Sequence, residues 1–104
     1  MNRLYVVLLA SLAPGPRIAQ AAHGMASFAR AHPESLKAWA DGHNTIACVT
    51  VPDAAAYEGL LLRLDIDRVP YAIFREPDLG NAITAVAIAP HPRATAHCAH
   101  LPLA

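Results

Sequence analysis

The sequence predicts an α/β layered sandwich built around four strands, in a sheet that is mostly parallel or mixed. Two observations carry this prediction. Hydrophobic residues make up 55% of the 104 residues and charged residues only 15%, which is typical of one folded domain and not of a disordered chain. In addition, strand-like and helix-like patterns follow one another in the order β-α-α-β-α-β-β, as in layered α/β folds.

The run LYVVLLA near the N-terminus allows two interpretations. It is apolar on both faces, which is typical of a buried central strand, here over residues 3–10. It also resembles the apolar part of a signal peptide, with Ala19-Gln20-Ala21 imitating a cleavage site, although it is too short to span a bilayer. The two cysteines lie fifty residues apart without a CxxC pattern, which favours a reducing compartment. We therefore expect a retained strand in a cytoplasmic protein, with a secreted domain as the alternative.

The second element is a helix over residues 17–31. It follows a turn at residues 11–16, in which Pro16 suits a first helical turn because its missing N–H is not needed there. The spacing of apolar residues predicts a buried stripe formed by Ile18, Ala22, Met25, Phe28 and Ala29. The polar residues of this helix are expected on the opposite side, and they are Arg17, Gln20, His23, Ser27 and Arg30.

The remaining elements are read from the same kinds of pattern. The helices are expected at residues 33–41 and from residue 52 onward, the strands at 45–51, 69–75 and 82–89, and a polar loop at 76–81. The helix after Pro52 is expected to bury Tyr57, Leu60, Leu61 and Leu64, with Asp53 favourable near its N-terminus. The tail after Pro92 is expected to hold a helical turn or a short helix.

Gln20 and His23 are the first candidate site residues. Residues three apart on a helix share a face, and this helix begins where the first strand ends. Open α/β sheets bind ligands at the carboxyl ends of their strands, so the pair is expected to line a substrate cleft. The alternative is a polar stripe that faces solvent.

The acidic segment REPDLGNAIT, residues 75–84, is the second candidate. Glu76 and Asp78 flank a proline after the third strand, and Thr84 opens the next strand. A carboxylate can polarise a histidine or a water molecule, whereas the alternative is an acidic turn capped by Asp78. In the tail, His97, Cys98 and His100 have no second cluster at a zinc-site spacing, so no metal site is expected.

Three segments together resemble a known family. PGPRIAQAAHGM, FREPDLGNAITAVAIAP and LPLA are similar to the type 2 peptidyl-tRNA hydrolases, the archaeal and eukaryotic type, and most to their divergent bacterial relatives. The resemblance covers almost the whole chain and implies a single domain over residues 1–104, a three-layer α/β/α sandwich with a four-stranded mixed sheet. It also implies hydrolysis of the ester between peptide and tRNA, without a cofactor. The implied partner is peptidyl-tRNA or tRNA, with a homodimer as a further expectation and no membrane association.

The resemblance also implies roles for residues. The catalytic set that it implies is Gln20, His23, Glu76, Asp78 and Thr84. The residues expected to bind substrate are Arg17, Ser27, Arg30 and Arg75, of which Arg75 matches a family position. Two departures stand out, because Pro16 replaces the family's lysine and Glu76 replaces its aspartate. These departures and the formal net charge of zero favour the alternative of a weak or inactive relative that binds tRNA, a nucleotide or a protein.

Overall fold

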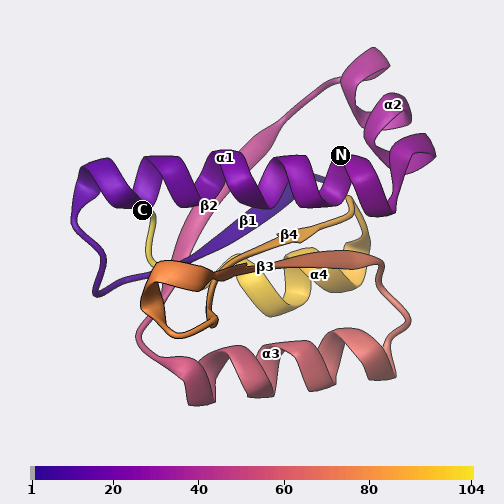
Figure 1. Cartoon of the computed structure of the whole chain (residues 1–104). Helices are drawn as coiled ribbons and strands as arrows, with labels where there is room; N and C mark the ends of the chain where they lie inside the picture. The colour runs from indigo at the N-terminus through magenta and orange to yellow at the C-terminus, as the bar shows by residue number, and fades with distance from the viewer. Residues whose placement is uncertain (1) are drawn as a thin grey trace.

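The computed structural model describes residues 2–104, and its elements follow the predicted order with a helix in the tail (Figure 1). The strands are β1 (Leu4–Leu9), β2 (Ile46–Val51), β3 (Tyr71–Glu76) and β4 (Ala82–Ile88). The helices are α1 (Pro14–Ala31), α2 (Pro33–Asp41), α3 (Ala54–Ile66) and α4 (Pro92–Cys98), and a 3-10 turn, η1, spans Pro77–Leu79.

The four strands form one mixed sheet in the order β2-β1-β4-β3. β1 is parallel to β2 and antiparallel to β4, and β4 is antiparallel to β3. Figure 1 shows α1 on one side of the sheet and α3 and α4 on the other. The predicted α/β sandwich with a four-stranded mixed sheet is therefore confirmed.

The apolar N-terminal run forms the central strand β1, as predicted. Its side chains alternate between two hydrophobic clusters, with Tyr5 and Val7 packed toward α3 and α4, and Leu4, Val6 and Leu8 packed toward α1. All five are buried, because β1 lies between two other strands and beneath helices on both faces. Within residues 2–104, no helix is both long and apolar enough to cross a membrane.

Helix α1 differs from the prediction in its start and in its buried face. It begins at Pro14 and not at Arg17, because the N–H groups of a first helical turn need no intrahelical partner. The predicted apolar stripe is wrong in part: Phe28 is buried as expected, but Ile18 is 71% exposed and Ala22 is exposed, whereas Gln20 and Gly24 are buried in their place. A Cβ atom at residue 24 would lie 3.0 Å from the Cβ of Ala85, so glycine is what lets the helix lie this close to β4.

Helix α3 follows the prediction more closely. Asp53 caps its N-terminus, where the carboxylate accepts a hydrogen bond from the Ala56 N–H at 2.9 Å. Tyr57, Leu60 and Leu64 are buried as expected. The Tyr57 hydroxyl donates to the carbonyl oxygen of Val7 at 3.0 Å, which satisfies the one polar group that this face of the helix carries into the core.

The last residues of the chain extend the sheet beyond β2. Leu103 forms an antiparallel bridge with Val49. The Thr50 N–H donates to the Pro102 carbonyl at 2.8 Å, and the Ala104 N–H donates to the Cys48 carbonyl at 2.9 Å. Residues 102–104 therefore cover part of the edge of β2 and end beside the first turns of α1 (Figure 1).

Candidate functional site

A β-bulge in β4 directs Thr84 toward α1. Phe74 pairs with Ala85 and the next residue, Arg75, pairs with Ile83, so Thr84 has no partner on β3. The extra residue interrupts the alternation of side chains, and both Ala85 and Thr84 then face α1 while Ile83 packs toward α3. The bulge thus places a hydroxyl group beneath the first half of the helix.

Thr84, Gln20 and Glu76 form a chain of hydrogen bonds from the core to the surface. The Thr84 hydroxyl donates to Gln20 Oε1 at 2.7 Å, and Gln20 Nε2 donates to Glu76 Oε1 at 3.1 Å. Thr84 is fully buried, Gln20 is 6% exposed and Glu76 is half-buried. Because a carboxylate only accepts hydrogen bonds, the amide nitrogen of Gln20 must face Glu76 and its oxygen must face Thr84.

His23 lies beside this chain on the next turn of α1. Its ring stacks on Phe74 with centroids 4.3 Å apart and planes within 6° of parallel. Phe74 and Glu76 share the face of β3 that packs against α1, so the ring and the carboxylate occupy neighbouring positions on the same flank of the helix. His23 is exposed, and its ring is therefore both held in place and accessible.

Arg17 lies elsewhere. Its Nη2 group donates to the carbonyl oxygens of Ala10 and Leu12, both at 2.9 Å, so the side chain holds the turn between β1 and α1. It lines a pocket together with Leu8 of β1 and Cys48 of β2. These two strands lie on one side of β4 and Glu76 of β3 lies on the other, so Arg17 does not join the carboxylate.

The other predicted residues are also outside the cluster. Asp78 is exposed in η1, and no hydrogen bond or ion pair of its side chain is found within residues 2–104. The Arg75 guanidinium is exposed and donates to the Asn81 carbonyl at 3.4 Å. Ser27 and Arg30 line a hollow beside Ala72 and Ile73 near the start of β3, toward the other end of α1. The structure thus brings together Gln20, His23, Glu76 and Thr84.

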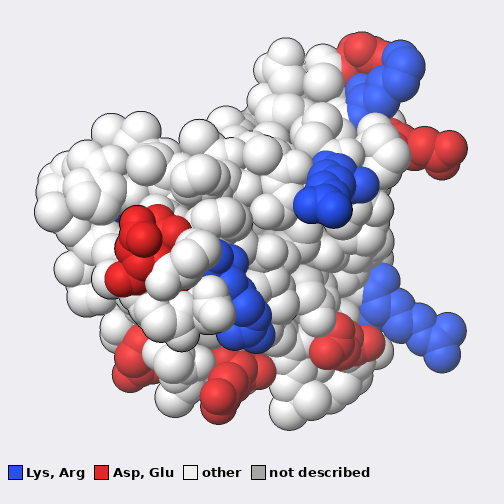
Figure 2. All heavy atoms as spheres, in the orientation of Figure 1, with Lys and Arg blue, Asp and Glu red and all other residues white. Residues whose placement is uncertain are grey.

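Charged side chains do not gather into a large patch of one sign around this site. On the face that carries α1 and β3, basic and acidic side chains are interspersed and most of the surface is uncharged (Figure 2). An extended polyanion binds to dense basic surface, which this face does not offer.

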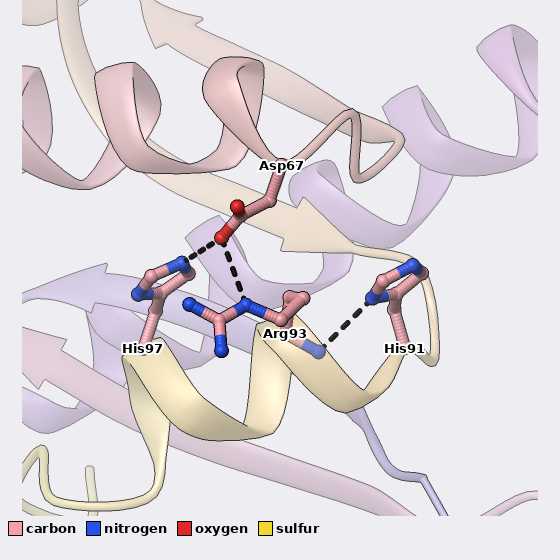
Figure 3. Close-up of polar contacts among 4 residues, drawn as sticks. All are labelled: Asp67, His91, Arg93 and His97. Atoms are coloured by element: carbon pink, nitrogen blue, oxygen red, sulfur yellow. Dashed lines mark hydrogen bonds and ion pairs between the residues drawn. The ribbon is translucent and has the colours of Figure 1, made fainter.

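A second polar cluster, on the opposite face of the sheet, was not anticipated from the sequence. Asp67 Oδ2 accepts from Arg93 Nε at 3.1 Å and from His97 Nε2 at 2.6 Å, and Figure 3 shows how both side chains of α4 converge on the end of α3. Hydrogen bonds from His97 and from Arg93 hold the pKa of Asp67 below its ordinary range. His91 Nδ1 accepts from the Arg93 N–H at 3.0 Å and caps α4. This cluster joins α3 to α4, on the other side of the sheet from Gln20 and Glu76.

The histidines and the cysteine of the tail do not converge. His97 bonds Asp67, while Cys98 is fully buried in the core, where burial raises the pKa of its thiol to about 12. Across residues 2–104, no three side chains of His, Cys, Asp or Glu are placed to hold a metal ion together.

Comparison with known proteins shows the fold alone. No family model matches the chain, and no curated protein matches its sequence. Among solved structures, a protein of unknown function from Agrobacterium tumefaciens strain C58 superposes with a TM-score of 0.72 at 14% sequence identity. The superposition covers 99% of this chain and 97% of the other, so the whole architecture is shared and not a fragment of it.

Proposed function

We propose that this protein hydrolyses the ester bond of peptidyl-tRNA slowly, with Glu76 as the base. The observation that carries the proposal is the hydrogen-bond chain from Thr84 through Gln20 to Glu76. In this chain, two buried groups fix the position of a carboxylate that reaches the surface. The family resemblance of the segments that contain these residues supports the substrate class, and a cytoplasmic location is part of the proposal.

The reaction needs a water molecule and no cofactor. The water oxygen attacks the ester carbonyl carbon while Glu76 accepts one of the water's protons. The tetrahedral intermediate then collapses, the bond between the carbonyl carbon and the ribose oxygen breaks, and the proton passes from Glu76 to that oxygen. The products are a free peptide carboxylic acid and tRNA with its terminal hydroxyl restored.

The other residues of the site support this step in different ways. Gln20 and Thr84 are too deeply buried to touch a substrate, so they act as positioning residues. Gln20 occupies one oxygen of Glu76 and leaves the second for the water. His23 is exposed and stacks on Phe74, so it offers a ring nitrogen to the substrate. The ring face turned away from Phe74 can stack with the base of the last nucleotide of the tRNA.

Binding without turnover is the second candidate function, and Arg17 is the observation that favours it. Hydrolysis of an ester develops negative charge on the carbonyl oxygen, which a nearby cation stabilises. Pro16 cannot supply that cation, and Arg17 is committed to the carbonyls of its own turn on the far flank of α1. A site with a base and no cation is expected to be slow or silent.

The test is turnover of a peptidyl-tRNA, measured as release of free tRNA, in the wild type and in Glu76→Gln. We expect a slow reaction that Glu76→Gln lowers by about a hundredfold or more, as for loss of a general base. Glu58→Gln, which changes an exposed glutamate on α3, is the matched control and should react like the wild type. A larger loss in Asp78→Asn than in Glu76→Gln would overturn the assignment of the base. Retention of tRNA without any release would establish the binding function instead.

A further inference from the structure

The strand β3 forms an open edge of the sheet. It is the last strand in the order β2-β1-β4-β3, and within residues 2–104 it pairs only with β4. Figure 1 shows it at the near edge of the sheet, between α1 and α3. The opposite edge, along β2, is partly covered by residues 102–104. An edge strand without a neighbour is a template to which another extended chain can add.

The alternation of the backbone shows which groups of β3 face away from the sheet. The carbonyl oxygens of Pro70 and Glu76 each accept an N–H at 2.9 Å from residues that flank β4. In an antiparallel pair, every second residue bonds with the neighbouring strand and the residues between them direct their N–H and C=O groups outward. The outward residues of β3 are therefore Tyr71, Ile73 and Arg75.

One of these outward groups is already occupied. The Nε2 atom of His32 lies 2.8 Å from the Tyr71 carbonyl oxygen, so the end of α1 is tied to the start of the edge. The backbone N–H and C=O groups of Ile73 and Arg75 have no hydrogen-bond partner among the described residues. Two donors and two acceptors on one side of β3 therefore remain for a ligand.

The open edge leads directly to the candidate site. A hollow of about 400 Å³ lies beside Ile73, where Ser27 and Arg30 of α1 line it. The exposed ring of His23, stacked over the following residue of the strand, comes next, and Glu76 ends the strand. Three residues of strand cover roughly 10 Å. An extended chain along this edge therefore passes the hollow and reaches the carboxylate.

We propose that the peptide of the substrate binds as an added strand along β3. Its C-terminal residue carries the ester and lies at Glu76, so the peptide runs parallel to β3. Ile73 and Arg75 hold it by backbone hydrogen bonds, and a side chain three or four residues before the ester fills the hollow. Backbone bonds tolerate many peptide sequences but require an extended chain. This inference deepens the proposed hydrolysis and rests on it, because it names how the same site holds the peptide.

The test uses analogues that cannot be hydrolysed, so that binding is measured apart from turnover. The long analogue is an acetylated five-residue peptide of alternating threonine and valine, joined by an amide to 3′-amino-3′-deoxyadenosine. The short analogue carries a single acetylated valine. Calorimetry should show that the long analogue binds at least about tenfold more tightly, since each backbone hydrogen bond adds a modest net gain.

Amide hydrogen exchange, followed by NMR, locates the bound peptide. The long analogue should slow exchange of the Ile73 and Arg75 amides, which face outward in the free protein. The amides of Ala72 and Phe74 face β4 and are the internal control, because they should exchange slowly with and without the analogue.

Two further changes assign the interaction to the backbone of β3. N-methylation of every second peptide amide should abolish the gain in one of its two phases and leave it in the other, because only alternate amides face β3. Arg75→Pro removes an outward N–H where an edge strand tolerates proline, and it should lower the affinity for the long analogue to that for the short one. Arg75→Ala keeps this N–H and should retain the gain. If Arg75→Pro fails to fold, the two N-methylated peptides decide the matter.

The outcomes separate this inference from the hydrolysis itself. Equal affinity for the long and short analogues, unchanged exchange of the two outward amides, or equal effects of the two methylation phases would overturn it, even if peptidyl-tRNA is hydrolysed. Protection of these amides in the free protein that increases with protein concentration would also overturn it, by showing that a second copy occupies the edge. Protection by the long analogue without any release of tRNA would support the peptide site and refute the hydrolysis.

Discussion

The two faces of the sheet differ in the size of the side chains that β4 presents to the helices. Toward α3 and α4 the sheet and its helices contribute large residues, among them Tyr5, Val86, Ile88, Tyr57, Leu60 and Leu64. Toward α1, β4 contributes the small residues Ala85 and Ala87, and the helix meets Ala85 with Gly24, while the larger side chains on this face come from β1 and from Phe74 of β3. Large side chains bury more apolar area and therefore contribute more to the free energy of unfolding.

The difference explains why the polar chain lies on one face only. Small residues bring the backbone of α1 close to β4, so a glutamine side chain can span from the helix to the Thr84 hydroxyl and to Glu76. On the other face, the Tyr57 hydroxyl donates to a backbone carbonyl within the core, and the ion pair of Asp67 with Arg93 lies where α3 ends and α4 begins. We infer that the α3 face mainly stabilises the domain and that the α1 face holds its site.

The largest expected effect is on the α3 face. Leu64→Ala removes a fully buried side chain and leaves a cavity, so the free energy of unfolding should fall by about 2–5 kcal/mol in urea denaturation. The control is Leu62→Ala, because Leu62 lies on the same helix and is 62% exposed. Its expected change is within about 0.5 kcal/mol. Equal losses for both variants would contradict the packing of Leu64 in the core on the α3 face.

A smaller effect is expected when the polar chain of the α1 face is broken. Thr84→Val keeps the shape of the side chain and leaves the buried Gln20 oxygen without its donor, which should lower the free energy of unfolding by about 1–3 kcal/mol. Thr50→Val is the control, since the Thr50 hydroxyl is 3.5 Å from its acceptor and contributes little. A neutral Thr84→Val would mean that Gln20 finds another partner.

Gly24→Ala tests the close approach of α1 to the sheet. The new methyl group would lie 3.0 Å from the Ala85 Cβ and 3.6 Å from a methyl group of Val6, so the helix must shift. Overpacking of this kind exceeds the gain of about 1 kcal/mol in helix propensity, and we expect a net loss of about 1 kcal/mol in thermal or urea unfolding. Gly15→Ala has nothing within 4 Å and should be neutral or stabilising. The same sign for both variants would show that α1 is not held tightly.

The smallest effect concerns pH. The pKa of Asp67 is lowered in the folded state, so the cluster stabilises the fold above the ordinary aspartate pKa of about 4. This contribution is lost as pH falls through the lower folded-state pKa. Below about pH 4, the melting temperature of Asp67→Asn should therefore fall less steeply with decreasing pH than that of the wild type. Asp41→Asn, at an exposed ion pair on α2, should leave that slope unchanged.

The order of elements could be predicted because its signals are local. Apolar runs such as residues 4–9 and breakers such as Pro33 and Pro52 act over a few residues, and the structure places strands and helices accordingly. The buried face of α1 could not be predicted in the same way. Its alanines give little contrast between sides, and Gln20 is buried only because Thr84 and Glu76, 64 and 56 residues away, satisfy its amide.

The rest of the site depends on contacts that no local pattern encodes. Thr84 faces α1 because of a bulge, and a regular strand would have turned it toward α3. The stack of His23 on Phe74 and the cluster of Asp67 with α4 join residues from separate elements. The hydrogen bonds of Arg17 are an exception, because they are local. A long basic side chain directly after a turn can reach the backbone carbonyls of that turn.

Residues 102–104 have a consequence for the behaviour of the protein at high concentration. An outer strand with unpaired N–H and C=O groups is a template onto which a second chain can add, which leads to aggregation. The bridge between Leu103 and Val49, with the bonds to Thr50 and Cys48, occupies the middle of this edge of β2. Residues 102–104 thus protect the edge of β2 from pairing with a second chain. Their release would expose backbone N–H and C=O groups of β2 while the hydrophobic core stays intact.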